Sequence, residues 1–392
     1  MPFGGCRAAP CRGLGRSPNK AKRGDIVDYV VISGYYGSGN GGDEAMLFAI
    51  LSALREKDPD IYVTVISSNP EETAKTHKVN AVHWLNFAAI TKEIFRAKLL
   101  ISGGGSLLQN VTSKQSLYYY LGIIWIAEAL NVPVMLYAQG IGPIYGKTAR
   151  NFMKYVGDKA KVITVRDAGS IYELERLNIT KPKIECTADP VLALTQRNAH
   201  LADEILKTAN VDLEKKKIGI AVREWKGWLL YKEVLAEATD ILRRELEVEI
   251  IYIPMQSPED VFAAREVATL SKNGGVILEG PYDTEELLSL VGAMDLIIGV
   301  RLHALIFAAV MNVPMAGLSY DPKVGRFMMS MGDTVAGHIE DLQAETLVEA
   351  VKKKWENIEG IKKRQAELMP NLRKKALRNA ELALSLIKGG NI

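Results

Sequence analysis

The order of apolar and polar positions along the chain predicts short buried strands that alternate with longer amphipathic helices. In the first half, apolar runs rich in β-branched residues predict strands, and the stretches between them predict helices. The predicted strands are 29–33, 62–67, 99–102, 134–138 and 162–165, and the predicted helices are 42–57, 116–130, 148–159 and 168–177. Residues 184–187 and the following Asp189-Pro190 are expected to lead out of this half.

The same alternation begins again in the second half. Strands are predicted at 218–222, 248–253, 276–278, 296–300 and 315–318, and helices at 231–247, 259–272, 284–292, 302–311 and 323–331. From residue 344 onward a charged helical pattern predicts helices packed on a surface. The predicted fold class is therefore α/β, with two Rossmann-like doubly wound domains and a helical C-terminal tail. Such domains bind ligands beyond the carboxyl ends of their strands, so the site is expected in the cleft between the halves.

Chain length supports two domains, because 392 residues exceed the size at which one core usually keeps growing. We place an N-terminal Rossmann-like domain at 25–195, a linker with a short helix at 196–217, a C-terminal Rossmann-like domain at 218–342 and C-terminal helices at 343–392. Residues 1–24 contain Arg, Lys, Gly and Pro but no apolar run long enough for a signal peptide. We expect a disordered basic tail there, with a functional arm as the alternative.

Composition excludes several classes of protein. The apolar fraction of 48% and charged fraction of 24% are ordinary for a globular chain. The net charge of +3 becomes nearly neutral without the first 24 residues, which argues against nucleic-acid binding through a general positive field. Three cysteines without a CxxC pair or a His/Cys cluster predict no metal site and a reducing compartment. The most apolar segment, 117–126, is too short to span a membrane, so a cytoplasmic protein is expected.

A glycine-rich segment, residues 34–44 (GYYGSGNGGDE), follows the first strand and opens the first helix. Glycines at such a turn let backbone amides approach an anion or a sugar closely. It is not a dinucleotide fingerprint, because Ile66-Ser67-Ser68-Asn69 stands where an acidic residue would close the second strand. Asn40 and Asp43 are candidates for hydrogen bonds to a saccharide hydroxyl. The alternative is a tight turn that needs glycine geometry.

Two more glycine-rich segments follow the next buried strands. Gly103-Gly104-Gly105-Ser106 leaves a bare backbone surface, although close passage of another loop explains it nearly as well. Gln139-Gly140-Ile141-Gly142-Pro143 repeats the pattern. Three such segments at successive strand ends favour one shared site.

Arg166 ends the predicted strand 162–165. Its planar guanidinium is suited to bind a carboxylate or phosphate through two hydrogen bonds. A structural ion pair with Asp167 or Asp189 is the alternative, and the spacing does not separate the two.

The strongest candidate segment is Arg301-Leu302-His303, which follows the buried strand 296–300 and opens an apolar helix. A helix N-terminus, an arginine and a titratable imidazole then converge, which suits a phosphate beside a centre of proton transfer. A lone histidine is usually structural, but the neighbouring arginine and the strand-end position favour function.

Three further cations follow strands of the second half. Lys323 and Arg326 lie three residues apart and share a helix face, and Arg223 ends the strand 218–222. Each alone is explained by a solvated surface charge. With Arg301 they make four cations at strand ends with few matching acids, which predicts a strongly anionic small ligand.

Five phrases in chain order resemble the polysaccharide pyruvyl transferase family, and most closely its CsaB-type members, which act on secondary cell-wall polymers. The phrases are GYYGSGNGGDEA, ISGGGSLLQ, VRD, ADPVL and GVRLHALIFA, spread between about residues 28 and 331. The resemblance implies a glycosyltransferase-B-like pair of domains and phosphoenolpyruvate as donor. It also implies a lipid-linked saccharide containing N-acetylmannosamine as acceptor, and a 4,6-linked pyruvate ketal as product.

Site roles follow from the resemblance and the strand-end charges together. His303 is the predicted catalytic residue, since the family's Arg-Leu-His phrase is associated with donor binding and catalysis. The donor side comprises Arg301, Leu302, Lys323, Arg326, Arg166 and Arg223. The first half lacks that cluster of cations and is assigned to the acceptor, through Gly37, Gly39, Asn40, Gly41, Asp43, Gly104, Gly105 and Gln139.

No metal and no cofactor are expected, with phosphoenolpyruvate as a co-substrate, and the expected partners are the donor and the lipid-linked acceptor. No nucleic acid is expected. A lipid-linked acceptor would bring the protein to the inner face of the cytoplasmic membrane. Two alternatives remain: a sugar-nucleotide-dependent glycosyltransferase of the same fold, and a non-catalytic saccharide-binding protein.

Overall fold

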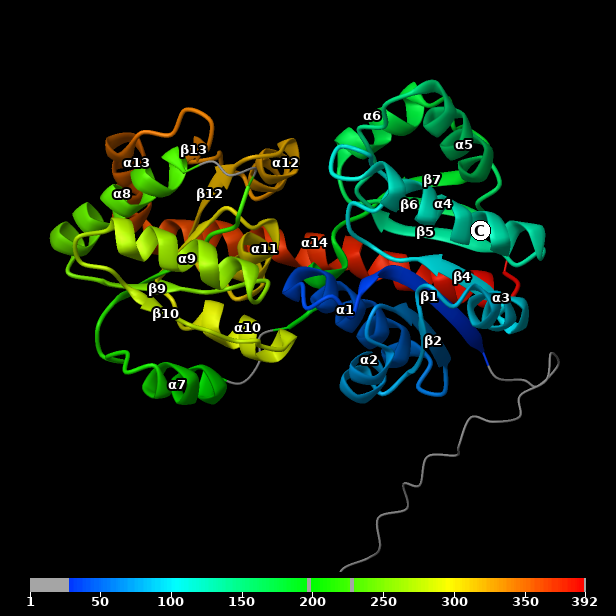
Figure 1. Cartoon of the computed structure of the whole chain (residues 1–392), viewed down its shortest axis with the longest axis horizontal. Coiled ribbons are helices and arrows are strands. Elements are labelled where there is room, and N and C mark those ends of the chain that lie inside the picture. Colours follow the sequence, from blue (N-terminus) through cyan, green and yellow to red (C-terminus); the bar gives the residue numbers. More distant parts are fainter. Residues whose placement is uncertain (1–27, 196–198, 226–228, 391–392) are drawn as a thin grey trace, which may run out of the picture.

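The structure is a computed structural model that describes residues 28–195, 199–225 and 229–390. Two α/β halves lie side by side, and the long C-terminal helix crosses from one to the other (Figure 1). The predicted tail 1–24 lies outside the described residues.

The first half is built on a parallel sheet of seven strands within the described ranges, in the order β3-β2-β1-β4-β5-β6-β7. Its strands are β1 (Tyr29–Tyr36), β2 (Tyr62–Ser67), β3 (Asn80–His83), β4 (Leu99–Ser102), β5 (Val134–Gln139), β6 (Val162–Val165) and β7 (Lys183–Cys186). Its helices are α1 (Gly41–Lys57), α2 (Pro70–His77), α3 (Phe87–Arg96), α4 (Lys114–Ala129), α5 (Lys147–Gly157), α6 (Ala168–Arg176) and the short 3₁₀ helix η1 (Pro190–Ala193).

The second half has six parallel strands in the described part of the chain, ordered β10-β9-β8-β11-β12-β13. These are β8 (Lys217–Ala221), β9 (Glu249–Tyr252), β10 (Val276–Ile277), β11 (Leu296–Gly299), β12 (Met315–Ser319) and β13 (Gly337–His338). The helices are α7 (Ala199–Thr208), α8 (Leu230–Leu246), α9 (Glu259–Leu270), α10 (Thr284–Gly292), α11 (Leu302–Val310), α12 (Pro322–Ser330), α13 (Ala344–Glu356) and α14 (Ile358–Ile387). Both strand orders reverse direction beside the first strand of the half, which is the Rossmann-like topology predicted.

The central strands form because their residues are apolar on both faces, as a parallel sheet covered by helices requires. All four residues of β4 and all four of β11 are buried. Side chains at the helix starts then fix where each chain segment turns from strand to helix. Asn40 caps α1 and Asp167 caps α6, each accepting backbone N–H bonds from the first turn.

The C-terminal helix α14 differs from the expected surface helix. Its last turns supply Ala380, Ala383 and Ile387 to the core that β1, β2 and α1 build in the first half. Asn379 is fully buried there and bonds the side chain of Thr187. The first half is therefore completed by the end of the chain.

Several elements were not predicted from the sequence, namely α2, β3 and α3 in the first half and β13 in the second. The strand β3 has the sequence NAVH and is only partly buried at the sheet edge, so its apolar pattern is weak. The helix expected within 196–217 is α7, which packs against α10.

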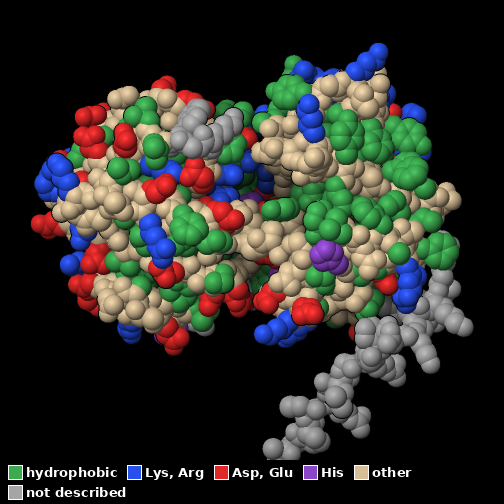
Figure 2. Space-filling model, viewed as in Figure 1, with side chains coloured by type: hydrophobic (Ala, Val, Ile, Leu, Met, Phe, Trp, Pro, Cys, Tyr) green, Lys and Arg blue, Asp and Glu red, His purple; other side chains and the backbone are tan. Residues whose placement is uncertain are grey.

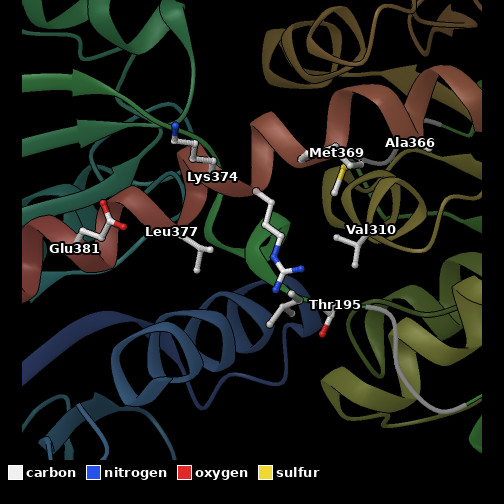
Figure 3. A pocket seen from close by; sticks show the side chains of 10 residues that line it. Thr195, Val310, Ala366, Met369, Lys374, Leu377 and Glu381 are labelled. Carbon is white, nitrogen blue, oxygen red and sulfur yellow. The ribbon is translucent and has the colours of Figure 1, made fainter. Parts of the chain in front are cut away.

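A cavity of about 520 Å³ lies between the end of η1, the end of α11 and the helix α14. Figure 3 shows Met369, Lys374 and Leu377 of α14 and Val310 of α11 around it. The residues that line it are distinct from those that the sequence assigns to the site.

Candidate active site

The carboxyl ends of both sheets face one crevice between the halves. Four of the predicted site segments follow strands at this edge. They are the glycine-rich turn after β1, Arg166 after β6, Arg301 after β11 and Lys323 after β12. Figure 2 shows a hollow between the halves with Lys and Arg side chains inside it. The predicted segments therefore converge on the place that the topology favours for ligands.

The start of α1 is docked on the second half. The backbone N–H of Gly41 donates to Met255 O at 2.7 Å, and Asn40 Nδ2 donates to Gln256 Oε1 at 3.3 Å. Asn40 Oδ1 also accepts from the N–H groups of Gly42 and Asp43. In this structure Asn40 joins the two halves and caps the helix, in addition to its predicted role toward a saccharide.

His303 lies directly against Gly42. A Cβ built on Gly42 would stand 1.9 Å from His303 Nδ1 and 2.4 Å from Cγ. Only a glycine at position 42 leaves room for the imidazole in this position. The glycine-rich turn of one half and the Arg-Leu-His phrase of the other are thus two sides of one site.

Asp189, at the start of η1, connects Arg166 to His303. Its Oδ2 accepts from Arg166 Nη1 at 2.7 Å and lies 3.9 Å from His303 Nε2, which has no hydrogen-bond partner among the described residues. Arg166 Nη2 also donates to Ser106 Oγ at 3.0 Å, and the guanidinium lies over Gly140. The ion pair of Arg166 with Asp189 is present, and it holds the guanidinium within the crevice.

The imidazole of His303 is neutral at physiological pH. Burial lowers its pKa from 6.5 to about 4; Asp189 opposes this shift, while the charges of Arg166, Lys323 and Arg301 add to it. The free ring nitrogen can accept a proton, and the carboxylate of Asp189 beside it favours the imidazolium that would result.

The pKa of Asp43, in the first turn of α1, is shifted in the opposite direction. Burial raises its pKa to about 7 and the neighbouring Glu44 adds to this, whereas Arg166, Lys323 and Arg301 oppose it. The same three cations therefore act on both Asp43 and His303. Two titratable groups with displaced pKa values in one crevice are typical of an acid–base pair.

Arg301 is held by the second half itself. Its Nε donates to both carboxylate oxygens of Asp260, at 3.2 and 2.9 Å, and Nη2 donates to Gln256 Oε1 at 3.2 Å. Asp260 is fully buried and also accepts the N–H of Met255. This pairing fixes the guanidinium at the N-terminus of α11. Leu302, predicted on the donor side, is buried in the core of the second half.

Lys323 and Arg223 both lie close to the Tyr320 ring. Arg223 Nη1 donates to Tyr320 Oη at 2.5 Å and its guanidinium lies 4.9 Å from the ring centre of Trp225. Lys323 Nζ is 5.2 Å from the ring centre of Tyr320 and 3.8 Å from Asp321 Oδ2. Burial raises the pKa of Tyr320, but the charges of Lys323 and Arg223 outweigh it and lower the pKa overall.

Arg326 reaches across the crevice to the first half. Its Nη1 pairs with Asp167 Oδ1 at 3.1 Å, and its guanidinium covers Gly169, where a Cβ would stand 2.1 Å from Cζ. Arg326, which the sequence assigned to the donor, therefore forms a contact between α12 and the start of α6 in this structure.

The residues assigned to the acceptor have varied surroundings. Gln139 is fully buried and donates to Ser102 O and Gly103 O, so it ties the ends of β4 and β5 together. Gly104 and Gly105 let Met46 approach, with its Sδ 3.0 Å from a Cβ on Gly104. The remaining two, Gly37 and Gly39, have positive φ angles of 76° and 73° in the turn before α1.

Four residues pair with the predicted site cations but were not assigned a site role from the sequence: Ser106, Asp189, Asp260 and Tyr320. Asp189 and Tyr320 follow strands, so their positions carry the same signal as Arg166 and Lys323. Asp260 lies in the first turn of α9, where acidic residues are common. Its position in the sequence therefore does not indicate that it pairs with Arg301.

Within the described ranges, no group of three or more His, Cys, Asp or Glu side chains is arranged to hold a metal ion. No helix in those ranges is long and apolar enough to cross a bilayer.

Comparisons with known proteins identify the family and the fold. A family model described as "Polysaccharide pyruvyl transferase" matches residues 40–322, whereas a comparison with curated proteins finds no significant match. Among solved structures, the S. aureus MnaA–UDP complex aligns with a TM-score of 0.65 at 13% identity, over 93% of this chain and 99% of that one. A glycosyltransferase from Rickettsia africae aligns with 0.63 at 14% identity, over 93% and 100%. Anabaena HepE in complex with UDP-glucose aligns with 0.62 at 12% identity, over 91% and 99%. These similarities establish a glycosyltransferase-B-like fold.

Proposed function

Because the chain belongs to the polysaccharide pyruvyl transferase family, we propose that this transferase moves the pyruvyl group of phosphoenolpyruvate onto two hydroxyls of a saccharide. The acceptor is a lipid-linked cell-wall precursor that contains N-acetylmannosamine, and the product is a 4,6-ketal with release of phosphate. The reaction takes place in the cytoplasm, at the inner face of the membrane that holds the lipid carrier.

The observation that carries this proposal is the group formed by Arg166, Arg301 and Lys323, whose charges all act on His303. Phosphoenolpyruvate carries a carboxylate and a phosphate that point away from its central carbon in different directions, so it needs cations at two points. Arg166 comes from the first half, whereas Arg301 and Lys323 come from the second. A small donor with these two anionic groups, bound between the cations, lies beside the imidazole.

Neutral His303 suits the addition of an alcohol to the central carbon of the donor. Its Nε2 is free to take the proton of the attacking hydroxyl, and the resulting imidazolium lies 3.9 Å from Asp189 Oδ2. The second hydroxyl then displaces phosphate from the same carbon, and the cations stabilise the charge of the leaving group.

A second candidate is sugar-nucleotide-dependent glycosyl transfer, because two of the similar folds are complexes with UDP and with UDP-glucose. The same cations would then hold a diphosphate. At 12–13% identity the similarity supports only the fold, so this candidate is second.

The test incubates the protein with a lipid-linked N-acetylmannosamine-containing disaccharide and either phosphoenolpyruvate or UDP-sugars. Phosphate release with phosphoenolpyruvate, together with a new ketal methyl signal in the NMR spectrum of the saccharide, is the expected result. Release of UDP with a sugar nucleotide would establish the second candidate. If the protein binds the saccharide but turns over neither phosphoenolpyruvate nor the UDP-sugars, it would be a binding protein.

A further inference from the structure

Asp43 is an acid in the crevice whose carboxyl has no hydrogen bond or ion pair within the described ranges. By contrast, Asp189 is paired with Arg166, and Asp260 with Arg301. Asp43 Oδ1 lies 3.3 Å from the place where a Cβ on Gly105 would stand, so the absence of a side chain there makes room for it. The free carboxyl therefore lies in the space that the glycine-rich turns leave open.

Charged and titratable groups act on Asp43 from both halves of the molecule. Its own helix contributes Glu44, whereas the cations come from the segments after β6, β11 and β12. The charge of Asp43 in turn acts on two buried phenols, one on β1 and one on α4. The groups are Glu44, Arg166, Arg301, Lys323, Tyr36 and Tyr120. A donor held by the three cations is thus placed beside Asp43 as well as beside His303.

We propose that Asp43 is the catalytic acid that protonates the methylene carbon of the enol phosphate donor, while His303 accepts the proton of the attacking hydroxyl. This assignment rests on the proposed function and goes beyond the acceptor-binding role predicted from the sequence. Asp43 approaches the donor from the first half and His303 from the second.

The atoms balance as follows. The Asp43 proton adds to the methylene carbon, which becomes the methyl group, and the first saccharide hydroxyl adds to the central carbon as His303 takes its proton. The second hydroxyl adds to the same carbon while the carbon–oxygen bond to phosphate breaks and phosphate leaves with the electron pair. His303 passes its proton to the leaving phosphate, and the proton of the second hydroxyl restores Asp43.

The electrostatics support this assignment. Burial and Glu44 raise the pKa of Asp43 to about 7, even though three cations oppose them. An anionic donor would neutralise those cations, so its binding should raise the pKa further. Donor binding and proton uptake are then linked, and the acid is protonated when the methylene carbon is beside it.

Calorimetry tests the linkage with phosphoenolpyruvate alone. The heat of binding at about pH 8, measured in two buffers of different ionisation enthalpy, gives the number of protons taken up. Wild type should take up more protons per donor than Asp43→Asn, by up to one, while both bind the donor. Equal uptake would overturn the proposal. Failure of wild type to bind phosphoenolpyruvate would refute the proposed function as well, which distinguishes the two failures.

Turnover provides the second readout. Asp43→Asn should reduce transfer by about 10²–10⁴-fold, the usual contribution of a general acid, and Asp43→Glu should recover part of it. Glu56→Gln is the matched control, because Glu56 is an exposed acid on the same helix α1, so this variant should stay within about threefold of wild type. If Asp43→Asn does not fold, Asp43→Ser takes its place. A rise only in the acceptor's Michaelis constant would return Asp43 to acceptor binding and overturn the proposal.

Discussion

Gly42→Ala tests whether the close contact between the two halves positions the imidazole of His303, the proposed catalytic base. The new Cβ would stand 1.9 Å from His303 Nδ1, whereas non-bonded heavy atoms need about 3.5 Å. The imidazole must therefore retreat by about 1.6 Å, or the halves must separate by a similar amount. A misplacement of about 1 Å at a catalytic group costs about 100-fold in rate, equivalent to about 2.7 kcal/mol of activation free energy.

Stability should change less than activity in this variant. Alanine favours a helix over glycine by up to about 1 kcal/mol, and overpacking a tight contact costs about 1–3 kcal/mol, so the net loss should be on the order of 1 kcal/mol. Gly122→Ala in α4 is the matched control, because nothing lies within 4 Å of its new Cβ. That control should gain up to about 1 kcal/mol of stability and keep wild-type turnover.

The assay measures single-turnover transfer from phosphoenolpyruvate, with urea unfolding of each variant. Because Gly42→Ala acts through His303, adding it to His303→Ala should cause little further loss. Wild-type turnover in a folded Gly42→Ala variant, or fully additive losses in the double variant, would refute this reasoning.

Three further predictions follow from the site. His303→Ala should lower turnover by about 10²–10⁴-fold with donor affinity unchanged within about threefold, and a retained tenth of wild-type turnover would contradict its role. Lys323→Ala should weaken phosphoenolpyruvate binding by about 1.5–3 kcal/mol in calorimetry, and Arg326→Ala by much less, because the free protein already pairs Arg326 with the first half. Since the pKa of Asp43 is raised from 3.8 to about 7, the folded state keeps a proton that the unfolded state has lost across this range. Wild-type stability relative to Asp43→Asn should therefore fall as pH rises from about 4 to about 7 and stay constant above; urea unfolding curves with a pH-independent difference would contradict it.

Most strands and helices were predictable because each depends on local pattern. The buried strands β2, β4 and β6 were predicted with the bounds observed. The edge strand β3 was missed because a half-covered strand needs no continuous apolar run. Strand ends also placed Arg166 and His303 at the crevice, since parallel strands end on one edge of their sheet.

Pairings between distant segments were not predictable, because they depend on how helices and halves dock. Arg301 pairs with Asp260 on α9, and Arg326 pairs with Asp167 of the other half. From the sequence, Arg301 and Arg326 were assigned to the donor because few acids lay near them along the chain. The opposite displacements of the pKa values of Asp43 and His303 also arise only when the two helix starts meet.

The return of α14 to the first half has a consequence for biosynthesis. The ribosome releases β1 to β7 long before residues 380–387, yet Ala380, Ala383 and Ile387 belong to their core. Until translation ends, the apolar side chains of α1, β4 and β5 that pack against α14 lack their final cover. The first half to be made is thus the last to be finished, and the nascent chain must keep that surface from aggregating while the second half is synthesised. A premature stop before α14 would leave a chain with every strand in place and the core of its first half still open.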